Sequence, residues 1–303
     1  MKSAPRILLA SLLLCASGCG ETIGPLLEPG ERCGTQGNAG AAFADPGLEA
    51  AVRSALNLGV GDALTCERVT TLPSVVAISA SITSLEGAQN LTGLQELILA
   101  GNSISDISPL SGLIGLEYLD LQENALTDIS LLSGLTNLLG LSLARNAISD
   151  IGPLRGLTRL ELLGLDHNSI SDIGPLAGLT TIFSLVLFDN SITDLEPLRG
   201  LTTLDILDLG ANSVPDLSPL SALEDLTQLG LEDTSVTDIS PLTGLTFLQV
   251  LLLDNNLTLS DIQPLIDNEG LIRGHTVSLN GTGVSCDDVA LLQDKGVTVI
   301  SQC

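Results

Sequence analysis

Hydrophobic and polar positions repeat every 22 residues over most of the chain. Each period contains the pattern LxxLxLxxN, as in residues 94–102, whose L-x-L core alternates apolar and variable positions. This alternation predicts a short strand with one buried face and one face in solvent. After the asparagine come an apolar residue, an acid and a Pro-Leu pair, and proline favours the first position of a helical turn. Each period therefore predicts a strand, a tight corner and a short return of 3₁₀ type, and such units stack into a solenoid.

The repeated asparagine marks the corner where the chain turns into the core. Its side chain carries both donor and acceptor groups, so it can satisfy the backbone groups that point inward there. We interpret the asparagines as a structural ladder and not as ligand contacts. Threonine and alanine at two of the corners lack some or all of this bonding capacity, so those corners should differ locally. The positions are Asn102, Asn124, Asn146, Asn168, Asn190, Asn212 and Asn256, with Thr234 and Ala80 as the exceptions.

The first residues predict export from the cytoplasm. Lys2 and Arg6 precede a short apolar run at residues 7–14, and small residues follow, as in a secretory signal. The sequence ASGC, ending at Cys19, resembles the lipobox of bacterial lipoproteins, in which this cysteine becomes lipidated after cleavage. The alternative is an ordinary secretory signal that leaves Cys19 as a free thiol. The lipobox implies a bacterial cell envelope protein that contacts the membrane only through its lipid, and Gly20 favours the outer membrane.

Four cysteines remain after Cys19 is lipidated, and they permit three disulfide connectivities. Eight strand spacings of about 4.8 Å separate the first and last repeats, a distance of roughly 38 Å. Disulfide-bonded cysteines have Cα atoms no more than about 7 Å apart. We therefore predict one pair, Cys33 with Cys66, at the N-terminal end and another, Cys286 with Cys303, at the C-terminal end. Both would protect the open ends of the solenoid.

Three segments carry a family resemblance. They are a cap, DPGLEAAVRSAL, repeats such as LEYLDLQENALTDIS, and the ending PLIDNEGLIRGHTVSLNGTGVSC. Together they resemble the bacterial 22-residue leucine-rich repeat proteins typified by internalins, over residues 43–303. The resemblance implies an α/β solenoid, a leucine-rich repeat horseshoe with a parallel β-sheet on the concave face, short 3₁₀ turns on the convex face and a helical N-cap. It does not identify the partner.

Composition agrees with one continuous solenoid, because 44% of residues are hydrophobic but only 2% aromatic, which suits a thin aliphatic core. The predicted organisation is a signal peptide at 1–18, a lipidated N-terminus and flexible tether at 19–42, an N-terminal helical cap at 43–71, about nine repeats at 72–270 and a C-terminal cap at 271–303.

Function should depend on the variable positions beside the strand leucines, because they point out of the concave face. From Ile98 onward these positions form columns across neighbouring strands. Four apolar members, Leu162, Val186, Phe188 and Ile206, predict an exposed patch with an acidic rim, and an apolar centre with a polar rim is typical of protein–protein sites. Scattered apolar residues are also common on surfaces without function. The predicted partner-binding residues are Tyr118, Asp120, Leu162, Asp166, Val186, Phe188, Asp189, Ile206, Asp208 and Glu232.

Charge restricts the partner. The formal net charge is -25, and loss of Lys2 and Arg6 with the signal gives 36 acids against 9 bases, or -27. This excludes nucleic acid and favours a partner with a basic or neutral surface. One acid repeats before each helical turn, as at Asp106 and Asp128, where it can accept a backbone hydrogen bond. Calcium binding by this column is a weaker alternative because the EF-hand spacing is absent. Solubility alone could also explain the acidity.

No catalytic motif, cofactor motif or metal-binding motif is present. His167 and His275 lie about five repeats apart, and there is no GxSxG sequence or phosphate-binding loop. The sequence therefore predicts a non-enzymatic lipoprotein that binds a protein partner through an acidic concave face, without a cofactor or metal. The alternative is a structural envelope component or a polysaccharide-binding module. Only Tyr118 and Phe188 offer aromatic rings to a sugar on this face, which favours a protein partner.

Overall fold

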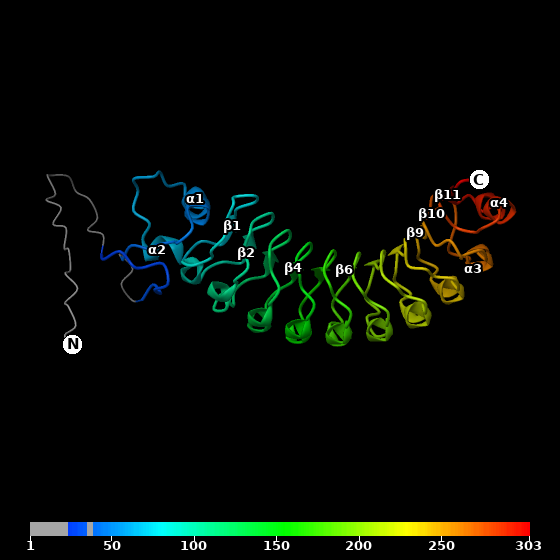
Figure 1. Cartoon of the computed structure of the whole chain (residues 1–303), viewed down its shortest axis with the longest axis horizontal. Coiled ribbons are helices and arrows are strands. Elements are labelled where there is room, and N and C mark those ends of the chain that lie inside the picture. Colours follow the sequence, from blue (N-terminus) through cyan, green and yellow to red (C-terminus); the bar gives the residue numbers. More distant parts are fainter. Residues whose placement is uncertain (1–23, 35–38) are drawn as a thin grey trace, which may run out of the picture.

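The computed structural model describes residues 24–34 and 39–303, and in them the chain is a curved solenoid (Figure 1). One parallel sheet runs from end to end, and its strands lie in sequence order. This confirms the predicted fold. The strands are β1 (Ser74–Val76), β2 (Glu96–Ile98), β3 (Tyr118–Asp120), β4 (Gly140–Ser142), β5 (Leu162–Gly164), β6 (Ser184–Val186), β7 (Ile206–Asp208), β8 (Gln228–Gly230), β9 (Val250–Leu252), β10 (Thr276–Ser278) and β11 (Thr298–Ile300).

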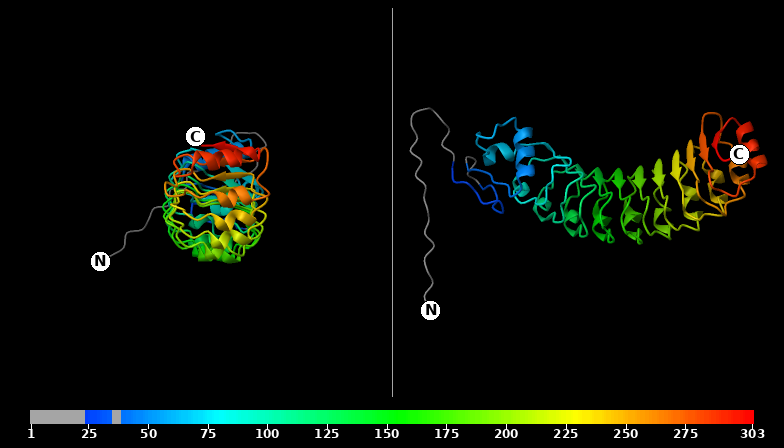
Figure 2. Two further views of the ribbon diagram at one scale, coloured as in Figure 1. Left: turned by 90° about the vertical axis from the view of Figure 1, so that its right-hand side faces the viewer. Right: turned by 45° about the horizontal axis from the view of Figure 1, so that its top comes forward.

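Short helical turns form the convex side, opposite the sheet, as Figures 1 and 2 show. Most begin with a proline in the first two positions, as the Pro-Leu pairs predict. From η2 (Ser108–Leu110) onward, the acid before each turn accepts a hydrogen bond from the backbone two residues later, for example Asp106 Oδ1 from Ser108 N at 2.8 Å. The turns are η1 (Ala88–Asn90), η2 (Ser108–Leu110), η3 (Ser130–Gly134), η4 (Gly152–Gly156), η5 (Gly174–Gly178), η6 (Glu196–Leu198), η7 (Ser218–Ala222), η8 (Ser240–Gly244) and α3 (Gln263–Asp267).

The asparagine ladder connects successive repeats. Asn168 Nδ2 donates to the carbonyl oxygens of Leu143 and Leu165, both at 3.0 Å, and its Oδ1 accepts from Ile148 N at 3.0 Å. Thr234 behaves differently: its hydroxyl donates to Leu231 O at 2.8 Å and to Asn256 Oδ1 at 3.1 Å. The threonine therefore satisfies fewer backbone groups than an asparagine, as predicted.

Helix α1 (Pro46–Ala55) covers the N-terminal end of the core. Its N-cap residue Asp45 is 6% exposed and accepts hydrogen bonds from Gly47 N and Leu48 N. The other carboxylate oxygen accepts from Thr83 N at 2.9 Å, which links the helix to the first repeat. Burial alone would raise the pKa of Asp45, but these backbone N–H donors outweigh it and lower the pKa. The short helix α2 (Cys66–Val69) then leads into β1.

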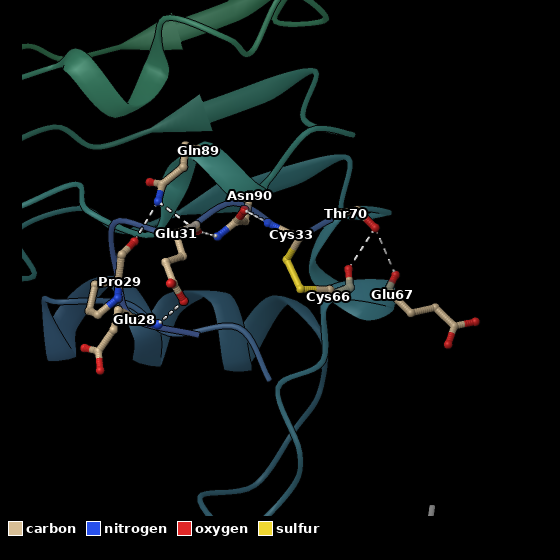
Figure 3. Close-up of a disulfide and its surroundings, with 9 residues drawn as sticks. All are labelled: Glu28, Pro29, Glu31, Cys33, Cys66, Glu67, Thr70, Gln89 and Asn90. Carbon is tan, nitrogen blue, oxygen red and sulfur yellow. Dashed lines mark hydrogen bonds between the residues drawn. A yellow bond between two sulfur atoms is a disulfide. The ribbon is translucent and has the colours of Figure 1, made fainter. Parts of the chain in front are cut away.

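The N-terminal segment packs against the cap, which corrects the prediction of a flexible tether for residues 24–34 and 39–42. Gln89 Nε2 donates to Pro29 O at 2.6 Å, and Asn90 Nδ2 donates to Glu31 O at 2.9 Å (Figure 3). A disulfide then joins Cys33 to Cys66, as predicted. The segment has no sequence period because side chains of η1 and a disulfide hold it. The predicted signal peptide (1–18) and lipidated Cys19 lie outside the described residues.

The C-terminal end closes with α4 (Cys286–Asp294) and β11, and a disulfide joins Cys286 to Cys303, as predicted. Lys295 also stabilises this end. Its Nζ donates to the carbonyl oxygens of Leu265, Ile266 and Asn268, at 3.1, 2.7 and 2.6 Å. These carbonyls end α3, so the lysine satisfies acceptors that the helix leaves free. None of the helices in the described part of the chain has the length and apolar character needed to cross a bilayer.

Candidate protein-binding face

Strand register brings the variable positions together on the concave face. Tyr118 pairs with Gly140 and Gly140 with Leu162, so these positions form one column across β3, β4 and β5. A second column places Gly164 beside Val186 and Val186 beside Asp208. The columns therefore follow the 22-residue period, as the sequence pattern predicts, and residues far apart in sequence share one surface.

An apolar hollow of about 240 Å³ opens on the N-terminal half of this face. Tyr118 and Leu162, each 41% exposed, flank Gly140. A β-carbon at Gly140 would lie 2.8 Å from Tyr118 Cδ1 and 3.9 Å from Leu162 Cδ1, so Gly140 is buried beneath the edge of the Tyr118 ring, which forms one side of the hollow. Gly164 and Val186 continue the lining. We name this feature the glycine hollow, lined by Tyr118, Gly140, Leu162, Gly164 and Val186.

The structure divides the predicted apolar patch. Leu162 and Val186 line the glycine hollow with Tyr118, whereas Phe188 and Ile206 lie elsewhere. Phe188 covers Gly210, where a β-carbon would lie 2.7 Å from the ring, and its ring centroid is 5.4 Å from that of His167. Ile206 lines a separate, smaller hollow of about 100 Å³. Phe188 thus packs partly against its own repeats instead of forming the centre of the patch.

Sequence reasoning missed two apolar residues at the N-terminal end of the face. Val76 is 55% exposed at the end of β1, and Ile78 is 59% exposed just beyond it. The first repeat has Ala80 where most other repeats have asparagine, so the sequence period does not mark its outward-facing positions. Buried and exposed residues alternate here, with Val75 and Ala77 buried, so the period-two pattern of a strand is the signal that identifies Val76 and Ile78 as outward-facing. The N-terminal half of the concave face is therefore more apolar than the sequence columns indicated.

The C-terminal half of the face is acidic. Asp208 and Glu232 come from successive repeats, and Asp166 lies two repeats before Asp208. Burial raises the pKa of the Asp208 carboxyl, and the negative charge of Asp166 raises it further. The hydrogen bond from Gly210 N, at 3.0 Å, acts in the opposite direction and lowers the pKa, but the net shift is upward. The carboxylate also lies over the next strand, where a β-carbon at Gly230 would be 2.6 Å from its Oδ1.

Glu232 is the least satisfied acid of this half. Its Oε2 atom is buried and has no hydrogen-bond partner among the described residues. Burial raises the pKa of Glu232, its own backbone N–H opposes this, and the charges of Asp208, Asp254 and Asp233 raise the pKa further. Together these effects make Glu232 and Asp208 a site of unfavourable negative charge. We name this pair the acidic subsite.

The two other acids predicted to bind a partner differ in their surroundings. Asp189 Oδ2 lies 2.6 Å from His167 Nδ1, so this acid already has a partner. Asp120 Oδ1 accepts from Gln122 N at 3.0 Å and lies at the edge of the glycine hollow. The base Arg145, which follows β4, has its Nε 3.6 Å from Glu123 Oε1. Glu232 differs from these acids because its buried Oε2 has no hydrogen-bond partner among the described residues.

Substitution Glu232→Gln should raise the free energy of unfolding at pH 7 by about 0.5 kcal/mol, the scale of charge effects between partly exposed groups. An acid whose pKa is raised on folding stabilises the protein below its unfolded pKa and loses that contribution as pH rises through the folded pKa. The gain should therefore vanish near pH 3, where the carboxyl is protonated in both states. Urea unfolding at both pH values measures this. An equal change in the free energy of unfolding at pH 3 and pH 7 would contradict a raised pKa of Glu232 in the folded protein.

Metal binding finds no support in the geometry. Across residues 24–34 and 39–303, no group of three or more His, Cys, Asp or Glu side chains is placed to hold a metal ion. The repeated acids of the convex side, such as Asp150 and Asp172, each accept a backbone hydrogen bond in their turn. These hydrogen bonds explain why an acid recurs before the turns without a metal ion.

Repeats, sheet and turns together define a leucine-rich repeat protein. The family model for Leucine Rich repeats (2 copies) matches residues 92–134, 114–156 and 136–178. Among solved structures, internalin InlF from Listeria monocytogenes is 30% identical over 86% of this chain and 90% of that chain, with a TM-score of 0.67. Internalin C2 from the same organism is 31% identical over 85% of this chain and 94% of that chain, with a TM-score of 0.58. The chain belongs to the internalin family.

A more distant structure shares the fold alone. The functional domain of InlJ from Listeria monocytogenes is 22% identical over 86% of this chain and 60% of that chain, with a TM-score of 0.68. No curated protein matches the chain by sequence. The leucine-rich repeat fold itself indicates protein–protein interaction, because stacked repeats create an extended concave binding surface.

Proposed function

We propose that the chain is a non-enzymatic, protein-binding module of the bacterial cell envelope, anchored through a lipidated Cys19, with the outer membrane as its site. It recognises a partner of basic or neutral surface through the concave face. The observation that carries this proposal is the combination, on one rigid sheet, of the glycine hollow and the acidic subsite. An apolar centre beside polar groups is the usual anatomy of a protein-binding surface.

A polysaccharide is a poorer ligand for this face. Sugars need hydrogen-bonding groups around an exposed aromatic platform, and the glycine hollow has an almost entirely apolar lining. Of the two aromatic rings considered, Tyr118 is exposed but Phe188 packs against Gly210 and His167. A partner protein can instead bury apolar side chains and supply cations for the acids.

The test uses a photo-crosslinking amino acid placed at one position on each face, in cells that produce the full chain. Gln228 is exposed on the concave β8, and Gly156 ends the convex η4, where nothing lies within 4 Å of an added β-carbon. We expect covalent protein adducts from position 228 and not from position 156. Equal yields from both faces, or no adducts from position 228, would refute the proposed function.

A further inference from the structure

We propose that the glycine hollow receives one large apolar side chain of the partner protein, and that the acidic subsite receives a lysine or arginine of the same partner segment. This inference rests on the proposed function and specifies how its site works. It commits to a protein segment in which an apolar residue and a basic residue are separated by a fixed distance.

The size of the glycine hollow suits a single side chain. Pockets for small molecules and cofactors usually measure about 300–1,000 Å³ and enclose most of the ligand. This hollow measures about 240 Å³ and opens onto the sheet surface. Tyr118, whose ring covers Gly140, and Leu162 line the hollow, and Gly164 leaves an open position beside them, so an inserted side chain would lie mainly against carbon atoms. Such anchor pockets supply much of the energy of protein–protein binding.

The acidic subsite supplies the second half of the recognition. Glu232 Oε2 is buried and lacks a hydrogen-bond partner among the described residues, and Asp208 lies close enough to raise its pKa. A β-carbon at Gly230 would lie 2.6 Å from Asp208 Oδ1 and 3.1 Å from Glu232 Oε2, so both acids reach over the same glycine. A cation from the partner beside these two carboxylates would offset their negative charge and relieve the repulsion between them.

The distance between the two subsites defines the partner segment. The hollow is centred on β4 and β5, and the acidic subsite on β7 and β8, which is three strand steps. At about 4.8 Å per step the separation is roughly 14 Å, the length of about four residues of extended chain. Val76 and Ile78 extend the apolar half toward β1, whereas the acids lie toward β9. The bound segment therefore places its apolar residue nearer the N-terminal end of the solenoid and its basic residue nearer the C-terminal end.

The experiment fills the hollow without removing any contact. Gly164 has no atom closer than 3.6 Å to an added β-carbon, so Gly164→Leu places an apolar side chain in the hollow with the strand intact. Gly178→Leu is the matched control, because nothing lies within 4 Å of a β-carbon at this convex position. The probe is a displayed library of random 12-residue peptides, selected on the unaltered chain, with folding of each variant checked by circular dichroism and thermal unfolding.

We expect enriched peptides that combine an apolar residue with a lysine or arginine about four residues away. Their affinity should fall at least tenfold for Gly164→Leu and stay unchanged for Gly178→Leu. The double variant Asp208→Asn with Glu232→Gln should retain the apolar preference and lose the preference for a base. Absence of enriched peptides, equal affinity for Gly164→Leu, or a basic preference that survives the double variant would overturn the inference.

The crosslinking assay separates this inference from the proposed function. If position 228 still yields protein adducts in the Gly164→Leu background, the chain binds protein through its concave face and the hollow is not the anchor. If position 228 yields none in the unaltered chain, the proposed function itself fails. Loss of adducts in Gly164→Leu alone, with Gly178→Leu unchanged, supports both.

Discussion

Replacing Asn212 with alanine should lower the free energy of unfolding by about 3–5 kcal/mol. Asn212 is only 4% exposed. Its Nδ2 donates to Leu187 O at 2.9 Å and Leu209 O at 3.0 Å, and its Oδ1 accepts from Ile192 N at 2.9 Å. Alanine leaves all three backbone groups without this partner, and each unsatisfied buried group costs about 1–3 kcal/mol. Urea unfolding followed by circular dichroism measures the loss.

Two variants serve as controls for the ladder. Asn212→Thr should lose less stability than Asn212→Ala, because Thr234 shows that a threonine at this corner still donates to the carbonyl three residues earlier. Asn137→Ala removes two exposed hydrogen bonds, one donated to Ile114 O and one accepted from Arg159 Nη1, and should change stability by less than about 1 kcal/mol. A loss below about 1 kcal/mol for Asn212→Ala would show that the asparagines do not support the corners.

Removal of the N-terminal disulfide by the double variant Cys33→Ser and Cys66→Ser should cost about 3–4 kcal/mol in the stability of the N-terminal end. The bond closes a loop with a sequence separation of 33 residues, and loop-closure entropy gives this magnitude. It also holds the segment that Gln89 and Asn90 bind, so the segment and α1 should open together. Amide hydrogen exchange locates this opening.

Exchange should increase at the cap and first repeats and stay unchanged beyond the middle of the sheet, because each repeat contacts only its neighbours. The amide of Ala41, which donates to Leu64 O at 2.7 Å, is a sensitive reporter. The double variant Cys286→Ser and Cys303→Ser provides the control, since its effect should appear only at the opposite end. Faster exchange along the whole chain would contradict independent protection of the two ends.

The sequence predicted those parts of the molecule that the 22-residue period determines. The buried leucines fix which positions of each strand face outward. Tyr118 and Leu162 therefore fall in one column, and this does not depend on which residues occupy those outward positions. The cysteine pairs followed from the length of the stack alone. The ladder followed from the hydrogen-bonding groups of asparagine, and Thr234 departs from it in the expected way.

The remaining features depend on contacts that have no sequence period. Residues 24–34 read as a tether because their partners, Gln89 and Asn90, lie almost 60 residues away and carry no special motif. The glycine hollow has no sequence signal, because the absent side chain at Gly164 does not appear in a pattern of hydrophobic residues. Phe188 was assigned to the centre of the patch because the sequence does not reveal that its ring can cover Gly210.

Glycines shape this surface in two ways. Gly210 accommodates the Phe188 ring and Gly140 accommodates the Tyr118 ring, so each ring packs against its own sheet. Gly164 has no atom closer than 3.6 Å to an added β-carbon, so it leaves an open position in the hollow. The functional surface therefore depends on the sizes of neighbouring side chains within a column, in addition to their polarity.

The yield of photo-crosslinked protein from concave position 228 relative to convex position 156, in cells that produce the full chain, tests the central claim most directly. Binding by the variable residues of the concave face predicts adducts at position 228 and none at position 156. Equal yields from the two faces, or adducts from position 156 alone, would contradict it.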